Sequence, residues 1–431
     1  MTELLATPAE WPKVLLPDAP AKKGAPAFAG LRKAIRELGP AGTIGLITES
    51  RLRGRGGSGF LAGDKWRAAA SVEATARYVV ANGYGADPAS QTDRTVMERN
   101  PGAVVEGAAI AAFAIGAEDA ILAVRAEATE AADALRGAVD AGYAAGALGP
   151  DVFGSGRRLD VEVRTVQGAY LLGEETILIK ALEGKRGQPE QRPPHPTEDG
   201  LWGMPTVVQN VQTLAAVPWI LERGAGAFRK IGTEEATGTI LVQVRGPEQA
   251  GVAEVPFGTS LRDIAKLAGA PSRGRKVKAI LVGGPSGGIL PADQLSAPYT
   301  FATMRDLGAH VGSGSVIVAD DRACIVDLAR LLTRYCADEA CGKTIPCRIG
   351  TRRLAEIGER LAGGTSRAGD LELAVDLSAD IVGSGLCDHE RLATLPLMSG
   401  LRYFRPEIDA HLERGECPAG VCRPIALAAS H

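Results

Sequence analysis

A glycine-rich segment, Gly54 to Gly59, constrains this chain more than any other feature of its sequence. Four of its six residues are glycine, so the backbone can adopt positive φ and another molecule can lie against its amide groups. A turn of successive N–H groups that leads into a helix forms an anion-binding nest, and Arg55 and Lys65 add positive charge beside it. The segment predicts a site for an anionic group, with a surface loop as the alternative for a glycine-rich run on its own.

Size and composition indicate a globular protein of several domains. The chain has 431 residues, of which 45% are apolar, and we expect it to form two to four domains. No apolar run has the length of a membrane span, and the N-terminus lacks a basic segment followed by an apolar stretch. We therefore expect no membrane insertion, no secretory signal and a cytoplasmic location. The net charge of −3 argues against a general nucleic-acid-binding surface.

Strands and helices alternate along the first half of the chain, which predicts a mostly parallel sheet with helices on its faces. A helix over 31–47 is expected to break at Gly39-Pro40. The remaining elements are strands at 77–82, 120–124 and 159–166, and helices at 107–115, 127–141 and 174–183.

The second half changes character near Gly232. Strands at 239–244, 251–255 and 279–282, with a helix at 261–267, predict a small β-grasp unit. From Ile325 onward the periodicity is helical, and four amphipathic segments predict a helical bundle. These segments are 325–335, 347–361, 372–381 and 397–412.

All seven cysteines lie in the last quarter of the chain. An odd number of cysteines without a secretory signal argues against a disulfide framework. Their concentration in one region points to a metal ion or a metal cluster.

Five motifs, in order over nearly the whole chain, resemble the flavoprotein (NADH-binding) subunit of respiratory complex I. The same module occurs in NAD-linked formate dehydrogenases and hydrogenases. The motifs are Gly54 to Trp66; Asn82 with Pro88 and Asp93-Arg94; Gly168 to Thr176; Gly200 to Asn210; and Cys341 to Arg348 with Leu401 to Arg405.

Residues 1–30 are rich in Pro, Ala and Lys, which predicts an extended arm that lies over the surface or contacts a partner. For the rest of the chain, the resemblance implies an α/β fold with three domains. A Rossmann-like domain for FMN and NAD would cover 31–232, and a β-grasp domain of the SLBB type would cover 233–320. A helical bundle at 321–431 would carry one 4Fe–4S cluster. The implied chemistry is hydride transfer between NADH or NADPH and FMN, followed by transfer of single electrons to the cluster.

The resemblance also assigns roles to individual residues. It places Glu174 and Glu175 at the flavin and the nicotinamide, with an acidic first helical turn as the structural alternative. The nucleotide clamp would include Phe60, with Arg192 and His195 standing where the family has a lysine and a phenylalanine. The implied FMN contacts are Gly54, Arg55, Gly56, Gly57, Lys65, Asn82, Gly173, Asn210 and Thr213.

The cluster motif departs from the family pattern of Cys-x2-Cys-x2-Cys with a fourth, later cysteine. Cys341 and Cys347 occupy the outer positions and Cys387 follows forty residues after Cys347, but the middle position is Thr344. Four thiolates are the ordinary ligands of a 4Fe–4S cluster. Cys336 is a candidate for the missing ligand. A three-cysteine cluster with an oxygen ligand, a 3Fe cluster and no cluster are the alternatives.

Two further cysteines, Cys417 and Cys422, stand apart from this motif near the C-terminus. Related hydrogenase and formate dehydrogenase subunits have a similar segment. Two cysteines cannot form a complete metal site by themselves, so we interpret the pair either as a vestige or as ligands shared with a partner subunit.

A further departure lies after the strand that ends at Asn82. The family has an Asp-Glu-Ser-Glu run there, whereas this chain reads Tyr84-Gly85-Ala86-Asp87. Less negative charge beside a flavin stabilises its reduced anionic form, so we expect a higher flavin potential than is usual in the family. Ala68 stands where the family has another clamping phenylalanine, which weakens the predicted nucleotide clamp.

The sequence therefore predicts an electron-transfer flavoprotein subunit of a multi-subunit oxidoreductase. We expect a ferredoxin-like 2Fe–2S subunit and a catalytic dehydrogenase subunit as partners. The alternative is a paralogue that has kept the scaffold, lost the cluster and catalysis, and serves as a structural subunit.

Overall fold

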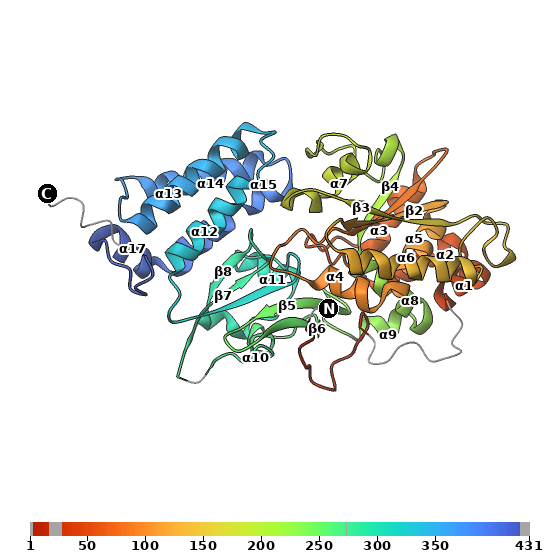
Figure 1. The fold of residues 1–431 in the computed structure, drawn as a ribbon, viewed down its shortest axis with the longest axis horizontal. Helices are drawn as coiled ribbons and strands as arrows, with labels where there is room; N and C mark the ends of the chain where they lie inside the picture. The colour runs from red at the N-terminus through yellow and green to blue at the C-terminus, as the bar shows by residue number, and fades with distance from the viewer. Residues whose placement is uncertain (1–2, 17–27, 273, 423–431) are drawn as a thin grey trace. The chain divides into compact units, whose positions relative to one another are not determined.

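The computed structural model describes residues 3–16, 28–272 and 274–422, which belong to two compact units (Figure 1). Unit 1 comprises Met1–Gln243 and Val252–Thr259, and unit 2 comprises Val244–Gly251 and Ser260–His431. The domain boundaries predicted at 30, 232 and 320 stay predictions.

A four-stranded parallel sheet forms the centre of unit 1. Its strands are β1 (Tyr78–Gly83), β2 (Asp119–Arg125), β3 (Asp160–Val166) and β4 (Thr206–Asn210), in the order β3-β2-β1-β4. Parallel strands need helical crossovers, so both faces of such a sheet are covered and the strands become apolar. β1 and β2 are accordingly buried along most of their length. The predicted parallel α/β sheet is confirmed, and the three strands predicted from the pattern are present.

Helices surround this sheet. Helix α5 (Pro101–Ile115) packs against α8 (Val211–Arg223) at Gly107, where a Cβ atom would overlap the carbonyl oxygen of Leu214. The break predicted at Gly39-Pro40 is present, since a π-helical turn, η1 (Ala34–Leu38), precedes α2. The helices of unit 1 are α1 (Ala29–Lys33), α2 (Gly39–Ser50), α3 (Ala62–Ser71), α4 (Thr92–Arg99), α5 (Pro101–Ile115), α6 (Thr129–Ala144), α7 (Glu175–Leu182), α8 (Val211–Arg223) and α9 (Ala225–Arg229).

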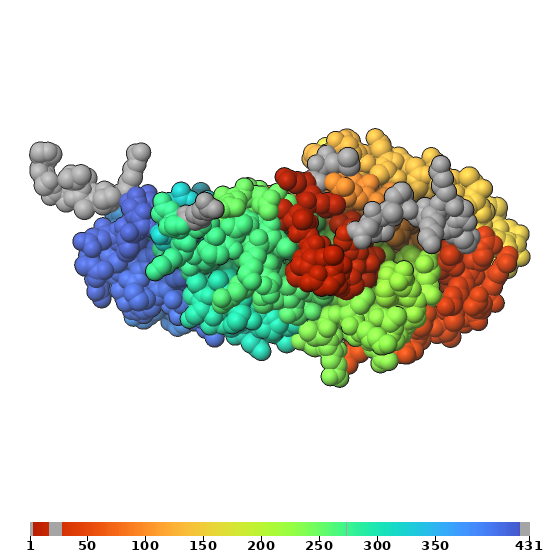
Figure 2. Space-filling view, turned by 90° about the horizontal axis from the view of Figure 1, so that it is seen from below, coloured from red at the N-terminus to blue at the C-terminus, as the bar shows by residue number. Residues whose placement is uncertain are grey.

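The N-terminal segment, dark red in Figure 2, is hydrogen-bonded to the rest of unit 1. The backbone amides of Val14, Leu15 and Leu16 donate to the carboxylate of Glu254 at 2.6–2.8 Å. Glu254 lies in β6 (Ala250–Pro256), and Leu15 is fully buried. The described part of the predicted arm is therefore tied to its own unit, and residues 17–27 lie outside the described residues.

Strands and helices also alternate around the boundary between the units. The chain runs through β5 (Thr239–Arg245), β6, α10 (Leu261–Lys266) and β7 (Val277–Val282), as the sequence predicts. Strands β8 (Gly288–Pro291) and β9 (Ser315–Asp320) each pair antiparallel with β7, and the order of this sheet is β6-β5-β9-β7-β8. Helix α11 (Phe301–Asp306) precedes β9. The assignment of the predicted β-grasp domain at 233–320 to the SLBB type stays a prediction.

The rest of unit 2 is helical around a shared apolar core. The prediction of a single helix over 397–412 is wrong. The segment is divided at Phe404 into α16 (Leu395–Tyr403) and α17 (Arg405–Arg414), because Pro406 has no N–H to donate and stands in the first turn of a new helix. Within the described ranges, no helix combines the length and apolar character needed to cross a bilayer. The helices are α12 (Ile325–Asp338), a π-helical turn η6 (Pro346–Thr351), α13 (Arg352–Gly363), α14 (Asp370–Ser384), α15 (Asp388–Leu392), α16 (Leu395–Tyr403) and α17 (Arg405–Arg414).

Candidate functional site

Two asparagines mark the carboxyl edge of the parallel sheet. Asn82 lies near the end of β1, Asn210 ends β4, and the two residues are partners in the register of these strands. The sheet extends through β2 and β3 on one side of β1, whereas β4 lies on the other side. In open α/β sheets, ligands bind at the carboxyl ends of the strands where the winding direction reverses. The structure thus brings both predicted FMN contacts to such a point.

The glycine loop lies beside this point. A Cβ on Gly56 would stand 3.4 Å from the Cβ of Asn210. The Arg55 amide donates to Oγ1 of Thr213 in α8 at 2.8 Å, which fixes the loop, and Gly57 and Gly59 have φ of +113° and +65°. Among the described residues, the backbone amides of Gly56 and Gly57 donate no hydrogen bond. The loop therefore offers backbone donors next to Asn210.

The side chain of Arg55 differs from the sequence-based expectation. It is 1% exposed, and its guanidinium donates to the carbonyls of Thr237 and Thr239 at 2.8 and 3.3 Å. The rings of Phe228 and Phe257 lie 5.8 and 5.4 Å from the guanidinium. Burial lowers the pKa of Arg55 to about 9. These carbonyl acceptors hold the Arg55 side chain in the interior of the unit, so only the Arg55 backbone contributes to the loop.

Lys65 takes part in a network of ion pairs. Its Nζ donates to Oε2 of Glu175 at 2.6 Å and to the carbonyl of Val208, in β4, at 3.1 Å. Arg192 contacts both glutamates, Glu175 at 2.9 Å and Glu174 at 3.2 Å. Four predicted site residues from three segments therefore lie together.

The two glutamates have different surroundings. Glu174 is the N-cap of α7, and its carboxylate accepts the backbone N–H groups of Thr176 and Ile177 at 2.8 and 3.0 Å. Burial raises the pKa of Glu174. Burial acts in the same direction on Glu175, but the charges of Lys65 and Arg192 bring its pKa below the ordinary value. The helix-start alternative describes Glu174, whereas Glu175 is an ionised group in the charge network.

The asparagines are held by partners, two of which were not predicted as site residues. Nδ2 of Asn82 donates to the Gly173 carbonyl at 2.9 Å. Nδ2 of Asn210 donates to both carboxylate oxygens of Asp93 at 3.0 Å, and Gln212 donates to Asp93 at 2.8 Å. Burial raises the pKa of Asp93. Asp93 and Gln212 therefore position Asn210. The sequence could have indicated both, because Asp93 belongs to the second motif and Gln212 lies two residues after Asn210.

Tyr84, in the turn after β1, is buried and bonded. It is 1% exposed, its hydroxyl donates to the Gly168 carbonyl at 2.5 Å, and the Arg125 guanidinium lies 4.7 Å from its ring centroid. A Cβ on Gly173 would stand only 2.9 Å from the Cβ of Ala86. Glycine at 173 therefore lets the turn after β1 approach this segment closely.

The predicted nucleotide-clamping residues are accessible. Phe60 is 56% exposed, and His195 is exposed, with its backbone N–H bonded to Glu198 at 2.8 Å. A hollow of about 450 Å³ opens elsewhere, near Tyr78, Asp119 and Trp202. Because Tyr78 and Asp119 begin their strands, this hollow lies at the opposite end of the sheet from the asparagines and is not the predicted site.

The cysteines of the predicted cluster are in unit 2, and all except Cys341 are buried. Burial, followed by the charge of Glu390 and then the neighbouring cysteines, raises the pKa of Cys347 to about 12. Burial, with a smaller effect of Cys347, raises the pKa of Cys336 to about 12. Thr344 donates from Oγ1 to the buried Glu390 carboxylate at 2.7 Å. Without a metal cation, these buried thiols are neutral.

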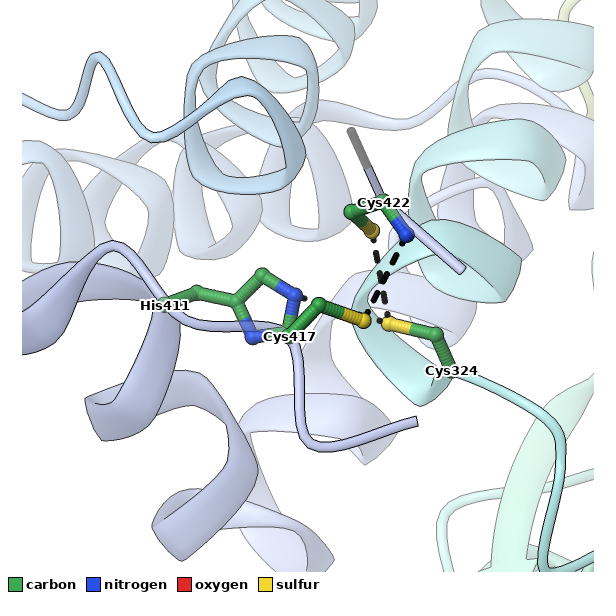
Figure 3. A group of neighbouring side chains, drawn as sticks. All are labelled: Cys324, His411, Cys417 and Cys422. Atoms are coloured by element: carbon green, nitrogen blue, oxygen red, sulfur yellow. Dashed lines mark hydrogen bonds between the residues drawn. The ribbon is translucent and has the colours of Figure 1, made fainter. Parts of the chain in front are cut away.

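A second group of metal-binding side chains lies near the described end of unit 2 (Figure 3). It consists of Cys324, His411, Cys417 and Cys422, whose ligand atoms all lie within 4.8 Å of one another. The interpretation of Cys417 and Cys422 as an isolated pair missed the other two residues. The available signals were the Cys-x4-Cys spacing and a cysteine directly before a helix.

Two family models match the chain. Residues 47–219 match the Nuo51 FMN-binding domain, and residues 327–411 match the NADH-ubiquinone oxidoreductase-F iron-sulfur binding region. The NADH-quinone oxidoreductase F 2 protein of Rhizobium meliloti is 39% identical over 91% of this chain and 93% of its own length. This chain belongs to the NADH-quinone oxidoreductase F family.

Other relatives of this family member come from hydrogenases. The NADP-reducing hydrogenase subunit HndC of Solidesulfovibrio fructosivorans is 39% identical over 92% of this chain and 81% of its own length. The solved NAD+-reducing NiFe-hydrogenase in its H2-reduced state is 34% identical with a TM-score of 0.82 over 90% of this chain. The chain spans 65% of that hydrogenase chain, about two thirds of its length.

Membership confirms the predicted resemblance, and with it the class of NAD(P)H dehydrogenase-type flavoprotein subunits that work in multi-subunit complexes. The FMN-domain match spans the glycine loop, both asparagines and the glutamates. The iron–sulfur match spans Cys336 to Cys387 and ends at His411, so it leaves out Cys324, Cys417 and Cys422. The backbone amides of Gly56 and Gly57 fit the phosphate of a cofactor such as FMN, and Asn82 and Asn210, each held by bonds within the chain, lie beside them.

Proposed function

We propose that this NADH-quinone oxidoreductase F homologue binds FMN at the carboxyl ends of β1 and β4, accepts reducing equivalents from NADH or NADPH, and delivers them singly to an iron–sulfur cluster. The observation that carries the proposal is the pairing of Asn82 with Asn210 at the reversal point of the sheet, beside the open amides of Gly56 and Gly57. Bound FMN supplies the exchange between two-electron and one-electron chemistry.

Each group at the sheet edge has a role in this proposal. The Gly56 and Gly57 amides would donate to the phosphate, and Asn82 and Asn210 would bond to the polar groups of the cofactor. Lys65 supplies a cation beside β4, because its Nζ lies 3.1 Å from the carbonyl of Val208 in that strand. Glu175 keeps this ammonium in place through their 2.6 Å ion pair.

The nucleotide would bind over the exposed side chains of the same unit. Phe60 provides an accessible ring on which an adenine can stack, and His195 can form a weaker second face. Arg192 retains a guanidinium suited to phosphate, and its pairing with both glutamates orients it.

For the cluster, we propose the ligands Cys341, Cys347, Cys387 and Cys336. The Thr344 hydroxyl is bonded to Glu390 at 2.7 Å, whereas Cys336 is a buried thiol whose contact to the Pro285 carbonyl, at 3.5 Å, is weak enough to be exchanged for iron. The scaffold-only alternative is not favoured, because both matched regions belong to redox modules. As partners we propose a ferredoxin-like 2Fe–2S subunit and a catalytic dehydrogenase subunit, in the cytoplasm.

The test is a spectrum of the chain purified with its partners under anaerobic conditions. We expect flavin absorption that bleaches when NADH or NADPH is added. A colourless preparation that takes up no added FMN would refute the proposal.

A variant of the loop tests the position of the cofactor. Gly56 is not in the left-handed region, so Gly56→Val adds bulk at the amides without forcing the backbone. We expect at least a tenfold loss of bound FMN. Gly45→Ala is the matched control, because Gly45 lies in α2 with no heavy atom within 4 Å of its added Cβ. Equal flavin content in both variants would place the cofactor elsewhere.

The turn at Tyr84 suggests a higher flavin potential than in relatives that carry acids there. Ala86→Glu would place an added carboxylate in this turn, close to Gly173, and we expect the midpoint potential of the flavin to fall because negative charge disfavours its reduced anion. Ala86→Gln is the neutral control. A potential that is unchanged or higher in the glutamate variant contradicts this idea.

A further inference from the structure

We propose that Cys324, His411, Cys417 and Cys422 bind one zinc ion that fastens residues 415–422 to the helices of unit 2. The inference concerns a site separate from the cysteines proposed for the cluster, and it does not depend on flavin chemistry. Cys324 lies at the start of α12, His411 lies in the last turns of α17, and the other two residues follow that helix (Figure 3).

The distances between the ligand atoms fit one tetrahedral ion. Zinc lies about 2.3 Å from a thiolate and about 2.0–2.1 Å from an imidazole nitrogen, so tetrahedral angles place two sulfurs about 3.8 Å apart and a sulfur and a nitrogen about 3.6 Å apart. The observed separations are 3.6 Å between Sγ of Cys324 and Cys422, and 3.6 Å between Sγ of Cys324 and Nε2 of His411.

The same distances argue against a 4Fe–4S cluster in this place. Each cysteine of such a cluster binds a different iron, so its ligand sulfurs stand farther apart than those around one ion. Here all four ligand atoms lie within 4.8 Å of one another. Three cysteines with one histidine are an ordinary ligand set of structural zinc sites, and two ligands with four residues between them fit the usual spacing.

His411 is held in the form that a metal requires. Its Nδ1–H donates to the Glu407 carbonyl at 2.8 Å, which leaves the lone pair of Nε2 on the side of the sulfurs. The Glu407 carboxylate accepts the N–H of Ile325, the residue after Cys324, at 3.1 Å. One residue outside the ligand set therefore positions both a histidine and a cysteine ligand.

Backbone donors point at the sulfurs as well. The amide of Asp327 donates to Sγ of Cys324, and the amide of Cys422 donates to Sγ of Cys417, both at 3.4 Å. Such N–H groups favour thiolates, the form in which cysteine binds metals. The loop from Cys417 to Cys422 is thus folded around its own first ligand.

The position of the ligands explains what the ion would do. Residues 415–422 form neither helix nor strand, yet Cys417, Ala419 and Cys422 pack against the apolar core of unit 2. Four protein ligands leave no open coordination position for a substrate, so the role is structural. The ion would join this segment to the start of α12 and the end of α17.

Metal analysis of the full chain, purified without a histidine tag, tests the assignment. We expect one zinc per chain, with at least a tenfold loss of zinc in Cys417→Ser and in Cys422→Ser. Cys336→Ser is the matched control, because Cys336 is a buried cysteine of α12 outside the group, and it should keep its zinc. A wild-type chain without zinc, or equal zinc in all variants, would overturn the proposal.

A cobalt experiment keeps the test decisive if the serine variants do not fold. Chain produced with cobalt should show the visible absorption of a tetrahedral ion with thiolate ligands, whether or not flavin binds. Iron in place of zinc at these residues, octahedral cobalt, or a disulfide between Cys324 and Cys422 in the unreduced protein would each overturn it. Loss of flavin with zinc intact would instead count against the proposed function alone.

Discussion

In unit 1 the side chains predicted to contact the cofactor are bonded to one another, whereas in unit 2 the best-formed group of ligands is one that the motifs did not predict. Lys65 pairs with Glu175, and Asn82 bonds to the carbonyl of Gly173. In unit 2, the middle position of the cluster motif holds Thr344, which bonds to Glu390. The separate group around His411 has its ligand atoms within 4.8 Å.

The difference follows from how each site is assembled. The unit 1 site lies where parallel strands end, so the strand order brings its residues together. A metal site requires only that a few side chains meet, and those of Cys324 and His411 meet across 87 residues of sequence. A motif search finds ligands that are close in sequence, and the fold reveals those that are not.

The largest expected effect separates the two cysteine groups. Cys387→Ala should remove most of the iron and sulfide, because three thiolates hold a 4Fe–4S cluster poorly. Flavin and zinc should remain at the wild-type level, because neither site includes Cys387. Cys417→Ser should give the opposite pattern of iron kept and zinc lost. Loss of both metals in both variants would show that the two groups form one site.

A second experiment sharpens the assignment of the fourth cluster ligand. Cys336→Ala alone should lower the iron content at least twofold if Cys336 replaces the missing cysteine. Adding Thr344→Cys should restore it, because this change completes the family spacing. Iron and acid-labile sulfide analysis, with the electron paramagnetic resonance signal of the reduced cluster, measures both. Unchanged iron in Cys336→Ala would exclude Cys336 as a ligand.

The sequence predicted the sheet of unit 1 well, because the buried strand at 120–124 is a short apolar run and the edge strand at 159–166 alternates apolar and polar residues. It failed where distant partners decide the outcome. Arg55 looks like an exposed loop charge until the carbonyls of Thr237 and Thr239, more than 180 residues away, take it into the interior. The division of the predicted last helix was foreseeable, since Pro406 cannot donate an N–H.

The two units should also differ in how acidity affects their stability. Burial raises the pKa of Glu106, in unit 1, to about 7, so its contribution is present at low pH and is lost as the pH rises from about 4.5 through 7. Burial lowers the pKa of His310, in unit 2, to about 4, so its contribution is lost as the pH falls from about 6.5 through 4.

Glu106→Gln tests the first half of this contrast. Glutamine can still accept the Leu31 amide, which bonds to Glu106 at 3.0 Å, but it does not ionise. We expect the variant to be more stable than the wild type at pH 8, by on the order of 3 kcal/mol at most, and similar to it at pH 5. Thermal unfolding at the two pH values measures the change, and an equal pH dependence in both proteins contradicts it.

The smallest expected effect concerns the nucleotide. Phe60→Ala removes an exposed ring that we propose stacks on the adenine, at a cost of about 0.5–1.5 kcal/mol, or roughly two- to tenfold in Kd. KM for NADH or NADPH should rise by this factor while flavin content and kcat stay the same, because the ring binds substrate and takes no part in hydride transfer. Trp202→Ala is the matched control, since Trp202 is also exposed but lines the hollow at the opposite end of the sheet. An equal rise in KM for both variants would mean that the aromatic surface acts nonspecifically, and the exposed ring of Phe60 would then need a different explanation.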